Sequence, residues 1–266
     1  MIDVEIAPQT RVATISLNNP KQLNSLDEQD FKDLSAALDQ AAQAGARALL
    51  IRGEGKAFCA GRNIQGVDPK NDDAYRYLHN VVTPVLRAIA KFPAPTFAAV
   101  HGACLGVGLG IAAACDVVYV AQSAKLGSPF AKLGAILDSG GHHLFVHRWG
   151  SHRAMDLIIT GDLISGEDAV RSGLFSRCLP DADLANFTRE KAEQAAAAPL
   201  DALLRSRAIV SELLNTPLGW WDSIEAENIH QGELSATDNY IEGITAFQEK
   251  RAPIFQHPSN PTETRR

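Results

Sequence analysis

The sequence lacks a regular cysteine framework. Its four cysteines stand at positions 59, 104, 115 and 178 and include no C-x-x-C pair. Isolated cysteines of this kind are typical of reduced thiols in a cytoplasmic protein. Cys59 stands among small and apolar residues, so we expect it to fill buried space rather than act as a nucleophile.

The sequence also lacks long apolar runs and an excess of basic residues. No uninterrupted apolar stretch reaches the ~18 residues that a membrane span needs. The first residues, MIDVEI, are acidic and strand-like and do not follow the pattern of an export signal. The formal net charge is -6, which argues against nucleic acids and anionic membranes as partners. We therefore expect a cytoplasmic protein.

What the sequence does contain is the composition of a globular enzyme and an alternating pattern of elements. Its 266 residues are 45% hydrophobic and 21% charged, enough to bury a large core. Strand patterns over 11–17, 47–52 and 96–100 alternate with helical patterns over 25–38 and 75–89. This alternation predicts an α/β fold.

The ends of several helices have sequence signals. Ser25 and Glu28 have the spacing of a capping box, so we expect the first helix to start there. Pro93 and Pro95 should end the second helix. Beyond about residue 183 the chain is helical throughout, over 191–198, 203–214, 220–234 and 239–251. We expect three parts: a core with the functional site over 1–182, a helical region over 183–252 and a loose tail over 253–266.

Two small-residue loops follow predicted strands. The first, FCAGRNI over 58–64, follows the apolar run 48–51. The second, GACLGVGLG over 102–110, follows the strand at 96–100 and leads into a helix expected at 111–114. Backbone N–H groups in such loops can point at a ligand, and the two loops can converge on one oxygen atom.

A single carboxylate, Asp138, lies on an apolar, glycine-bounded turn over 129–141. A partly desolvated carboxylate beside Ile136 and Leu137 is a candidate proton shuttle, because burial raises its basicity. The same residue could instead be the N-cap of a helix that begins near Ser139, since Asp is common at that position. The residues alone leave both roles open.

In order and spacing, these segments resemble the crotonase superfamily, which contains the enoyl-CoA hydratases and isomerases. The resemblance runs from residues 19–26, NPKQLNSL, through 150–179 to 247–253, FQEKRAP. It implies a crotonase-like spiral of strand-strand-helix repeats with a C-terminal helical region for assembly and for covering the site. It also implies a homotrimer or dimer of trimers and an acyl-CoA substrate, with no cofactor beyond the CoA of the substrate.

The resemblance also implies roles for individual residues. The backbone N–H groups of Arg62 and Val107 would form an oxyanion hole for the thioester oxygen. Further contacts with the substrate or its CoA are implied for Ala60, Ile64, Gly106, Phe130, Lys21 and Lys250. The two lysines would lie near the CoA phosphates, Lys250 reaching across from a neighbouring subunit, although surface lysines are usually only solvated.

Two departures from the hydratase pattern favour an isomerase. The glutamates that manage water in hydratases correspond to Gly110 and Phe130 here, and neither side chain can carry a proton. Asp138 matches the single acid of the enoyl-CoA isomerases. The segment from Phe130 to Gly141 is similar to the corresponding segment of the phenylacetate-pathway isomerases. We therefore expect double-bond migration rather than hydration.

Two other classes stay open. Aryl-CoA dehalogenases of the superfamily use an aspartate nucleophile at the position of Asp138, but Val82 and Thr83 stand where their base histidine aligns. A CoA-ester binding protein without chemistry is the second. His142, His143 and the segment 75–79 could select a ring-containing or oxygenated acyl group, or simply pack.

Dinucleotide and metal sites find little support in the sequence. The glycines at 106, 108 and 110 place the third glycine one position early for G-x-G-x-x-G. His143 and His147 are four residues apart but lack the glutamate of H-E-x-x-H. Ser139 lies beside His142, yet no G-x-S-x-G turn is present. We expect no metal.

Overall fold

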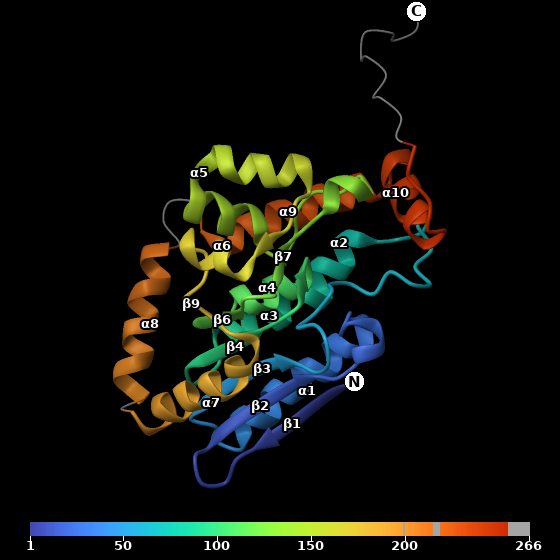
Figure 1. Cartoon of the computed structure of the whole chain (residues 1–266). Helices are drawn as coiled ribbons and strands as arrows, with labels where there is room; N and C mark the ends of the chain where they lie inside the picture. Colours follow the sequence, from blue (N-terminus) through green and yellow to red (C-terminus); the bar gives the residue numbers. More distant parts are fainter. Residues whose placement is uncertain (199, 215–218, 255–266) are drawn as a thin grey trace, which may run out of the picture.

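The computed structural model describes residues 1–198, 200–214 and 219–254 and has the α/β fold that the alternation predicts (Figure 1). A six-stranded sheet has the order β1-β2-β3-β4-β6-β9, and a three-stranded sheet has the order β5-β7-β8. The strands are β1 (Ile2–Ile6), β2 (Val12–Leu17), β3 (Ala48–Gly53), β4 (Thr96–Val100), β5 (Ala103–Leu105), β6 (Val117–Ala121), β7 (Lys125–Gly127), β8 (Ile164–Ser165) and β9 (Arg177–Leu179).

Helices follow the strands in the repeating order that the crotonase resemblance implies. The α-helices are α1 (Glu28–Gln43), α2 (Ala74–Arg76), α3 (Thr83–Ala90), α4 (Val107–Ala113), α5 (Gly141–Thr160), α6 (Gly166–Arg171), α7 (Asp181–Ala197), α8 (Leu200–Leu214), α9 (Trp220–Ser235) and α10 (Asp238–Gln248). Two short 3-10 turns, η1 (Pro20–Gln22) and η3 (Phe130–Leu133), and a π-helical segment, η2 (Tyr77–Val82), complete the described elements. None of the described helices is long and apolar enough to cross a membrane.

The main sheet is buried on both faces. Only β1 pairs antiparallel to its neighbour, and the other strands pair in parallel. Because side chains alternate across a strand, Leu49 and Ile51 of β3 join the large core under α1 and α3. Leu50 joins a second cluster on the opposite face, with Leu184 and Ala192 of α7. Two layers of helices therefore hold the sheet, as the uninterrupted apolar runs of its parallel strands require.

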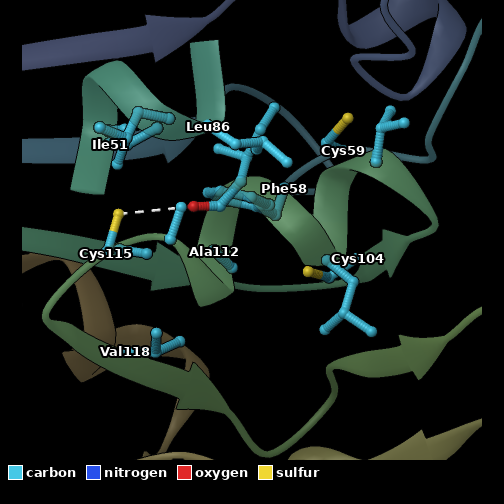
Figure 2. Packing of buried hydrophobic residues seen from close by; sticks show 14 of the residues in the cluster. Ile51, Phe58, Cys59, Leu86, Cys104, Ala112, Cys115 and Val118 are labelled. Atoms are coloured by element: carbon cyan, nitrogen blue, oxygen red, sulfur yellow. Dashed lines mark hydrogen bonds between the residues drawn. The ribbon is translucent and has the colours of Figure 1, made fainter. Parts of the chain in front are cut away.

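Figure 2 shows the part of the large core to which the two small-residue loops contribute Cys59 and Cys104. Cys59 and Cys104 belong to this core together with Ile51, Leu86 and Ala112. All four cysteines are free, and Cys59 and Cys104 are fully buried. The loops that follow β3 and β4 therefore rest on a packed apolar base.

The expected capping box at Ser25 and Glu28 is wrong. Helix α1 has Asp27 as its N-cap, and the Asp27 and Asp30 side chains each accept a hydrogen bond from the other residue's N–H. The helix starts later because Leu26 N–H donates to Gly61 O, which keeps the chain extended up to that residue. A long-range backbone contact thus overrides the local signal.

The helix that we expect from residue 111 begins four residues earlier, at Val107. Gly106, with φ 51°, ends the preceding strand and serves as the N-cap of α4. Gly108 and Gly110 belong to the helix rather than to a loop. A Cβ at Gly108 would lie 2.5 Å from Cys59 O, so this glycine permits a close helix-loop approach. The glycines at 108 and 110 therefore serve close packing of the helix rather than flexibility of a loop.

The C-terminal helices form where the sequence predicts them and return to the rest of the molecule. In Figure 1, α9 and α10 run from orange to red beside α2. Gly232 of α9 lies against Tyr75, and Gly243 of α10 lies against the backbone of Leu133, each at a distance that leaves no room for a Cβ. The division expected at residue 182 falls inside α7, and the expected tail lies outside the described residues from 255 on.

Candidate active site

The structure brings the two small-residue loops side by side. Cys59 and Cys104 form a parallel bridge, in which Cys59 N–H donates to Ala103 O at 3.0 Å and Leu105 N–H donates to Cys59 O at 2.9 Å. Gly102, with φ 54°, passes so close to Lys56 O that a Cβ would overlap it. The two loops therefore enter the site from one side, with Gly61 and Gly106 at their tips.

The geometry of these tips suits an oxyanion hole. Gly61 and Gly106 have φ angles of 101° and 51°, which L-residues rarely adopt. Val107 is the first residue of α4, so its N–H has no acceptor within the helix. In the described part of the chain, neither Arg62 N–H nor Val107 N–H donates to a backbone oxygen. Both groups are available to a ligand.

These loops form one side of a cavity of about 470 Å³. Its walls come from four parts of the chain: the segment around η1, the two loop tips, the turn from η3 to Asp138, and the helices α2, η2, α9 and α10. Lys21, Ala60, Ile64, Gly106, Phe130 and Asp138 all line it. Residues separated by more than one hundred positions in the sequence thus meet in one pocket.

Asp138 is a buried residue of the cavity wall. It is 8% exposed, and its Oδ1 atom is sealed from solvent. The N-cap residue of α5 is Gly140, with φ 84°, and no side chain caps the helix. The alternative in which Asp138 is the N-cap of this helix is therefore wrong.

Neither position that corresponds to a hydratase glutamate can hold a proton carrier as the chain stands. Gly110 has no space for a side chain, and Phe130 has an apolar one. A Cβ at Gly110 would lie 2.4 Å from Ser139 Cβ, so the space beyond this residue is filled. Phe130 lines the cavity and its ring tip lies 2.7 Å from the site of a Cβ on Gly106. The ring therefore rests against the oxyanion loop.

A buried ion pair behind the first loop was not foreseen. The Arg62 guanidinium donates to both Asp72 carboxylate oxygens at 2.8 and 2.7 Å, and Tyr240 OH donates to Asp72 Oδ2 at 2.7 Å. Burial opposes ionisation of Asp72, but the Arg62 hydrogen bonds and charge outweigh it and hold the pKa of Asp72 below its usual value. Tyr240 lies 168 positions from Asp72, so no local signal could reveal this cluster.

The residues expected near CoA have different environments. Lys21 is exposed at the cavity rim, and Ala60 lines the cavity. Ile64 O accepts a hydrogen bond from Gln248 Nε2 of α10 at 2.9 Å, so this carbonyl already has a partner. Lys250 is exposed just beyond α10 and is not among the residues that line the cavity in its own chain.

The segment 75–79 divides between two environments. Tyr77 and Leu78 line the cavity, whereas Tyr75 OH donates to Glu225 of α9 at 2.9 Å and His79 Nδ1 lies 2.7 Å from the same carboxylate. Only the first two can contact a ligand there. The segment includes a π-helical turn, a feature frequent at functional sites.

Three other sequence candidates, His143, His147 and Thr83, do not line the cavity of Asp138. His143 packs against His147 and Trp220 and borders a second cavity of about 500 Å³. Burial, with the nearby charges of His147 and Arg148, lowers the pKa of His143. Thr83, aligned with the dehalogenase base, donates to Leu78 O and does not line the cavity of Asp138.

Cys59 has the properties of a packing residue. Burial raises the pKa of its thiol to about 12, so the thiol stays protonated at neutral pH. No group of three or more His, Cys, Asp or Glu side chains is arranged to hold a metal among residues 1–198, 200–214 and 219–254.

Comparison with known proteins places this site in a family. The profile of the enoyl-CoA hydratase/isomerase family matches residues 8–258. The chain belongs to this family. A probable enoyl-CoA hydratase of Rhodobacter capsulatus is 34% identical over 244 residues, covering 92% of this chain and 94% of that protein. The 1,2-epoxyphenylacetyl-CoA isomerase of Escherichia coli is 34% identical over 250 residues, again covering 92% and 94%.

Solved structures agree with this membership. An enoyl-CoA hydratase from Mycobacterium avium subsp. paratuberculosis superposes with a TM-score of 0.84 and 26% identity, covering 96% of this chain and 98% of that one. The crotonase resemblance and the expected fold are therefore confirmed for this enoyl-CoA hydratase/isomerase family member.

Proposed function

We propose that this protein is an acyl-CoA enzyme that moves the double bond of a 3-enoyl-CoA thioester into conjugation with the thioester carbonyl. The observation that carries the proposal is the meeting of one buried carboxylate, Asp138, with two glycine-tipped loops in a single cavity. Family membership supports the thioester as the substrate class.

The proposed reaction uses Asp138 and Arg62, which line the cavity, and Val107, which directly follows the cavity residue Gly106. Asp138 removes a proton from C2, and the electron pair of that C–H bond forms an enolate. The N–H groups of Arg62 and Val107 hold the enolate oxygen, and such donors are each worth roughly 10²- to 10³-fold in rate. Asp138 then returns the proton to C4, and the double bond lies between C2 and C3. Atoms and charge balance without a further reactant.

Hydration has less support in this site. Water addition needs side chains that take and give protons to the water. Ser139 occupies the space in front of Gly110, and Phe130 offers an apolar ring. The relatives include both hydratase and isomerase names, so these names alone do not favour one reaction.

A substrate panel tests this proposal directly. The parent protein should isomerise trans-3-hexenoyl-CoA and should hydrate crotonyl-CoA at least about 100-fold more slowly, since Gly110 and Phe130 stand in place of the hydratase glutamates. Both reactions change the ultraviolet absorbance of the conjugated thioester. Hydration faster than isomerisation would contradict the isomerase assignment, and halide release from 4-chlorobenzoyl-CoA would favour the dehalogenase alternative.

We further propose that the chain assembles as a homotrimer or a dimer of trimers through its C-terminal region. Several large apolar side chains of this region are exposed in the single chain, namely Val210, Leu214, Ile229, Phe247 and Ile254. Light scattering after size exclusion should give a multiple of three of the 28.6 kDa chain mass. A monomer at micromolar concentration would contradict the assembly and the role of Lys250 across subunits.

A further inference from the structure

The hydroxyl of Tyr77 has no hydrogen-bond partner within the part of the chain that the structure describes. The residue is 4% exposed, and its oxygen is sealed from solvent. A buried hydroxyl without a partner destabilises the folded state by about 1–3 kcal/mol relative to one that is bonded. Such a group needs a physical explanation.

The ring of Tyr77 is held rigidly from two sides. Phe31 meets it edge-on at 6.0 Å between ring centroids, and the Arg62 guanidinium lies 4.1 Å from the ring centroid. Arg62 is itself fixed by its two hydrogen bonds to Asp72. The phenol therefore cannot swing away to find another acceptor without disrupting the first loop.

The phenol is a donor at neutral pH. Burial raises the pKa of Tyr77, the Arg62 charge opposes this rise, and the Asp138 carboxylate adds to it. The hydroxyl therefore keeps its proton and can act as a hydrogen-bond donor but not as a base.

Tyr77 and Asp138 line the same cavity, and the Tyr77 oxygen and Asp138 Oδ1 are both sealed from water there. An acyl group that fills this cavity with C2 and C4 at Asp138 therefore meets the wall to which Tyr77 belongs. Ser139 also has a partnerless buried hydroxyl, but it packs against Gly110 and does not line the cavity. Of these two hydroxyls, that of Tyr77 is therefore the one that can form a hydrogen bond with a substrate in the cavity.

We propose that Tyr77 is a specificity-determining residue that donates a hydrogen bond to an oxygen atom in the acyl group of the substrate. The preferred substrates are then acyl-CoA thioesters with a carbonyl or ether oxygen a few carbons beyond the thioester, rather than plain hydrocarbon chains. This inference rests on the proposed function, because it takes the Asp138 cavity as the acyl site.

The binding test uses the full-length protein and saturated thioesters that cannot react at a double bond. Dissociation constants are measured by calorimetry for hexanoyl-CoA and its 4-oxo, 5-oxo and 6-methoxy derivatives. At least one oxygenated ligand should bind the parent about 10- to 100-fold more tightly than Tyr77→Phe, because removing the donor leaves a buried acceptor unpaired. Hexanoyl-CoA should bind both proteins within about 3-fold, since a hydrocarbon chain offers no acceptor.

Tyr75→Phe is the matched control. Its hydroxyl lies two residues away on the same segment but bonds Glu225 outside the cavity. This variant should bind every ligand like the parent. Equal losses in both variants would assign the effect to general loosening of the segment and overturn the proposal, as would equal affinity of the parent and Tyr77→Phe for all four ligands.

Thermal unfolding gives a readout that needs no substrate. Because Tyr77→Phe removes an unsatisfied hydroxyl, its melting temperature should be unchanged or up to about 3 °C higher. A fall of more than about 3 °C would mean that the hydroxyl is already bonded in the free protein.

Turnover separates this inference from the proposed function. With trans-3-hexenoyl-CoA and its 6-methoxy derivative, Asp138→Asn should lose activity on both substrates. If Asp138→Asn does so while Tyr77→Phe shows no preference in binding, Tyr77 is not a specificity residue but the isomerase proposal stands. If Asp138→Asn stays active, the proposed function itself is wrong.

Discussion

The cavity of this protein has two unlike walls. The wall made by the loops after β3 and β4 presents backbone groups, fixed by glycines whose φ angles or close contacts exclude other residues. The opposite wall, made by α2, η2, α9 and α10, presents side chains such as Tyr77, Gln231, Tyr240 and Phe247. The first wall suits a chemistry common to many thioesters, and the second suits selection among acyl groups.

This difference teaches how one fold can keep a reaction and change its substrate. Backbone donors do not depend on the side chains of the residues that carry them, but they do depend on the loop shape that the glycines fix. A side-chain wall can change residue by residue without moving the donors. Changes to the loop wall and Asp138 should therefore lower kcat, and changes to the helical wall should alter KM and substrate preference.

The largest effect is expected at Asp138. Asp138→Asn keeps the size of the side chain but removes its ability to accept a proton, so kcat for trans-3-hexenoyl-CoA should fall by roughly 10²- to 10⁴-fold. KM should change little, because the thioester contacts are backbone groups. Steady-state kinetics and circular dichroism of the variant check this; a rate within a few-fold of the parent would remove Asp138 from the mechanism.

The next largest effect is expected at the oxyanion hole. Val107→Pro removes one donor, and proline is tolerated at the first position of a helix, so kcat should fall by about 10²-fold in a folded protein. Val107→Ala keeps the N–H and is the matched control, expected near the parent rate. Parent-like turnover by folded Val107→Pro would show that Val107 N–H does not hold the oxyanion.

A smaller effect on activity, but a clear one on stability, is expected at the buried ion pair. The sequence alone makes the Arg62 side chain dispensable, because only its N–H has a role. The structure changes this expectation: Arg62→Ala leaves Asp72, whose side chain is 5% exposed, with a buried charge. Breaking one partner of such a pair costs about 3 kcal/mol or more. Chemical denaturation should show this loss, and an unchanged midpoint would contradict it.

The same pair gives a pH dependence. The folded pKa of Asp72 lies below its ordinary value of 3.8, so its stabilisation is present above that value and disappears as pH falls through the folded pKa. The melting temperature of the parent should exceed that of Asp72→Asn near neutral pH. This difference should shrink as pH falls below about 4. A difference that stays constant with pH would mean that the charge of Asp72 adds no stability.

The smallest effect is expected where α10 contacts the first loop. Gln248 Nε2 donates to Ile64 O and Val67 O at 2.9 and 2.7 Å, but the side chain is exposed. Gln248→Ala should raise KM for acyl-CoA by no more than about 5-fold and leave kcat unchanged, since exposed hydrogen bonds contribute little net energy. A drop in kcat would show that α10 also positions the oxyanion loop.

The sequence predicts the two walls unequally well, for physical reasons. Strand periodicity reveals β2, β3 and β4, and the small-residue loops and the lone Asp138 mark the loop wall, because their constraints act within a few residues of sequence. The family resemblance predicts that these loops and Asp138 act on the same thioester. The start of α4 at Val107 was missed, since glycines that permit helix packing resemble glycines of a loop.

The helical wall depends on contacts that sequence spacing does not encode. Tyr75 and Tyr77 belong to the same predicted helical segment, yet only Tyr77 of the two lines the cavity, because residues two apart face different sides of a helix. The link from Asp72 to Tyr240 and the packing of Ser139 against Gly110 join distant segments. Only the folded chain reveals them.

Proton transfer itself is the most direct test of the central claim that Asp138 works at the oxyanion-hole cavity. The parent and Asp138→Asn are incubated with trans-3-hexenoyl-CoA in heavy water, and deuterium at C2 and C4 is followed by NMR, with dissociation constants measured in parallel. We predict that the parent converts the thioester, with deuterium at C4 only to the extent that the proton on Asp138 exchanges between the two steps, and that Asp138→Asn shows almost no conversion and no deuterium incorporation at equal thioester affinity. Conversion by Asp138→Asn at the parent rate would contradict the claim.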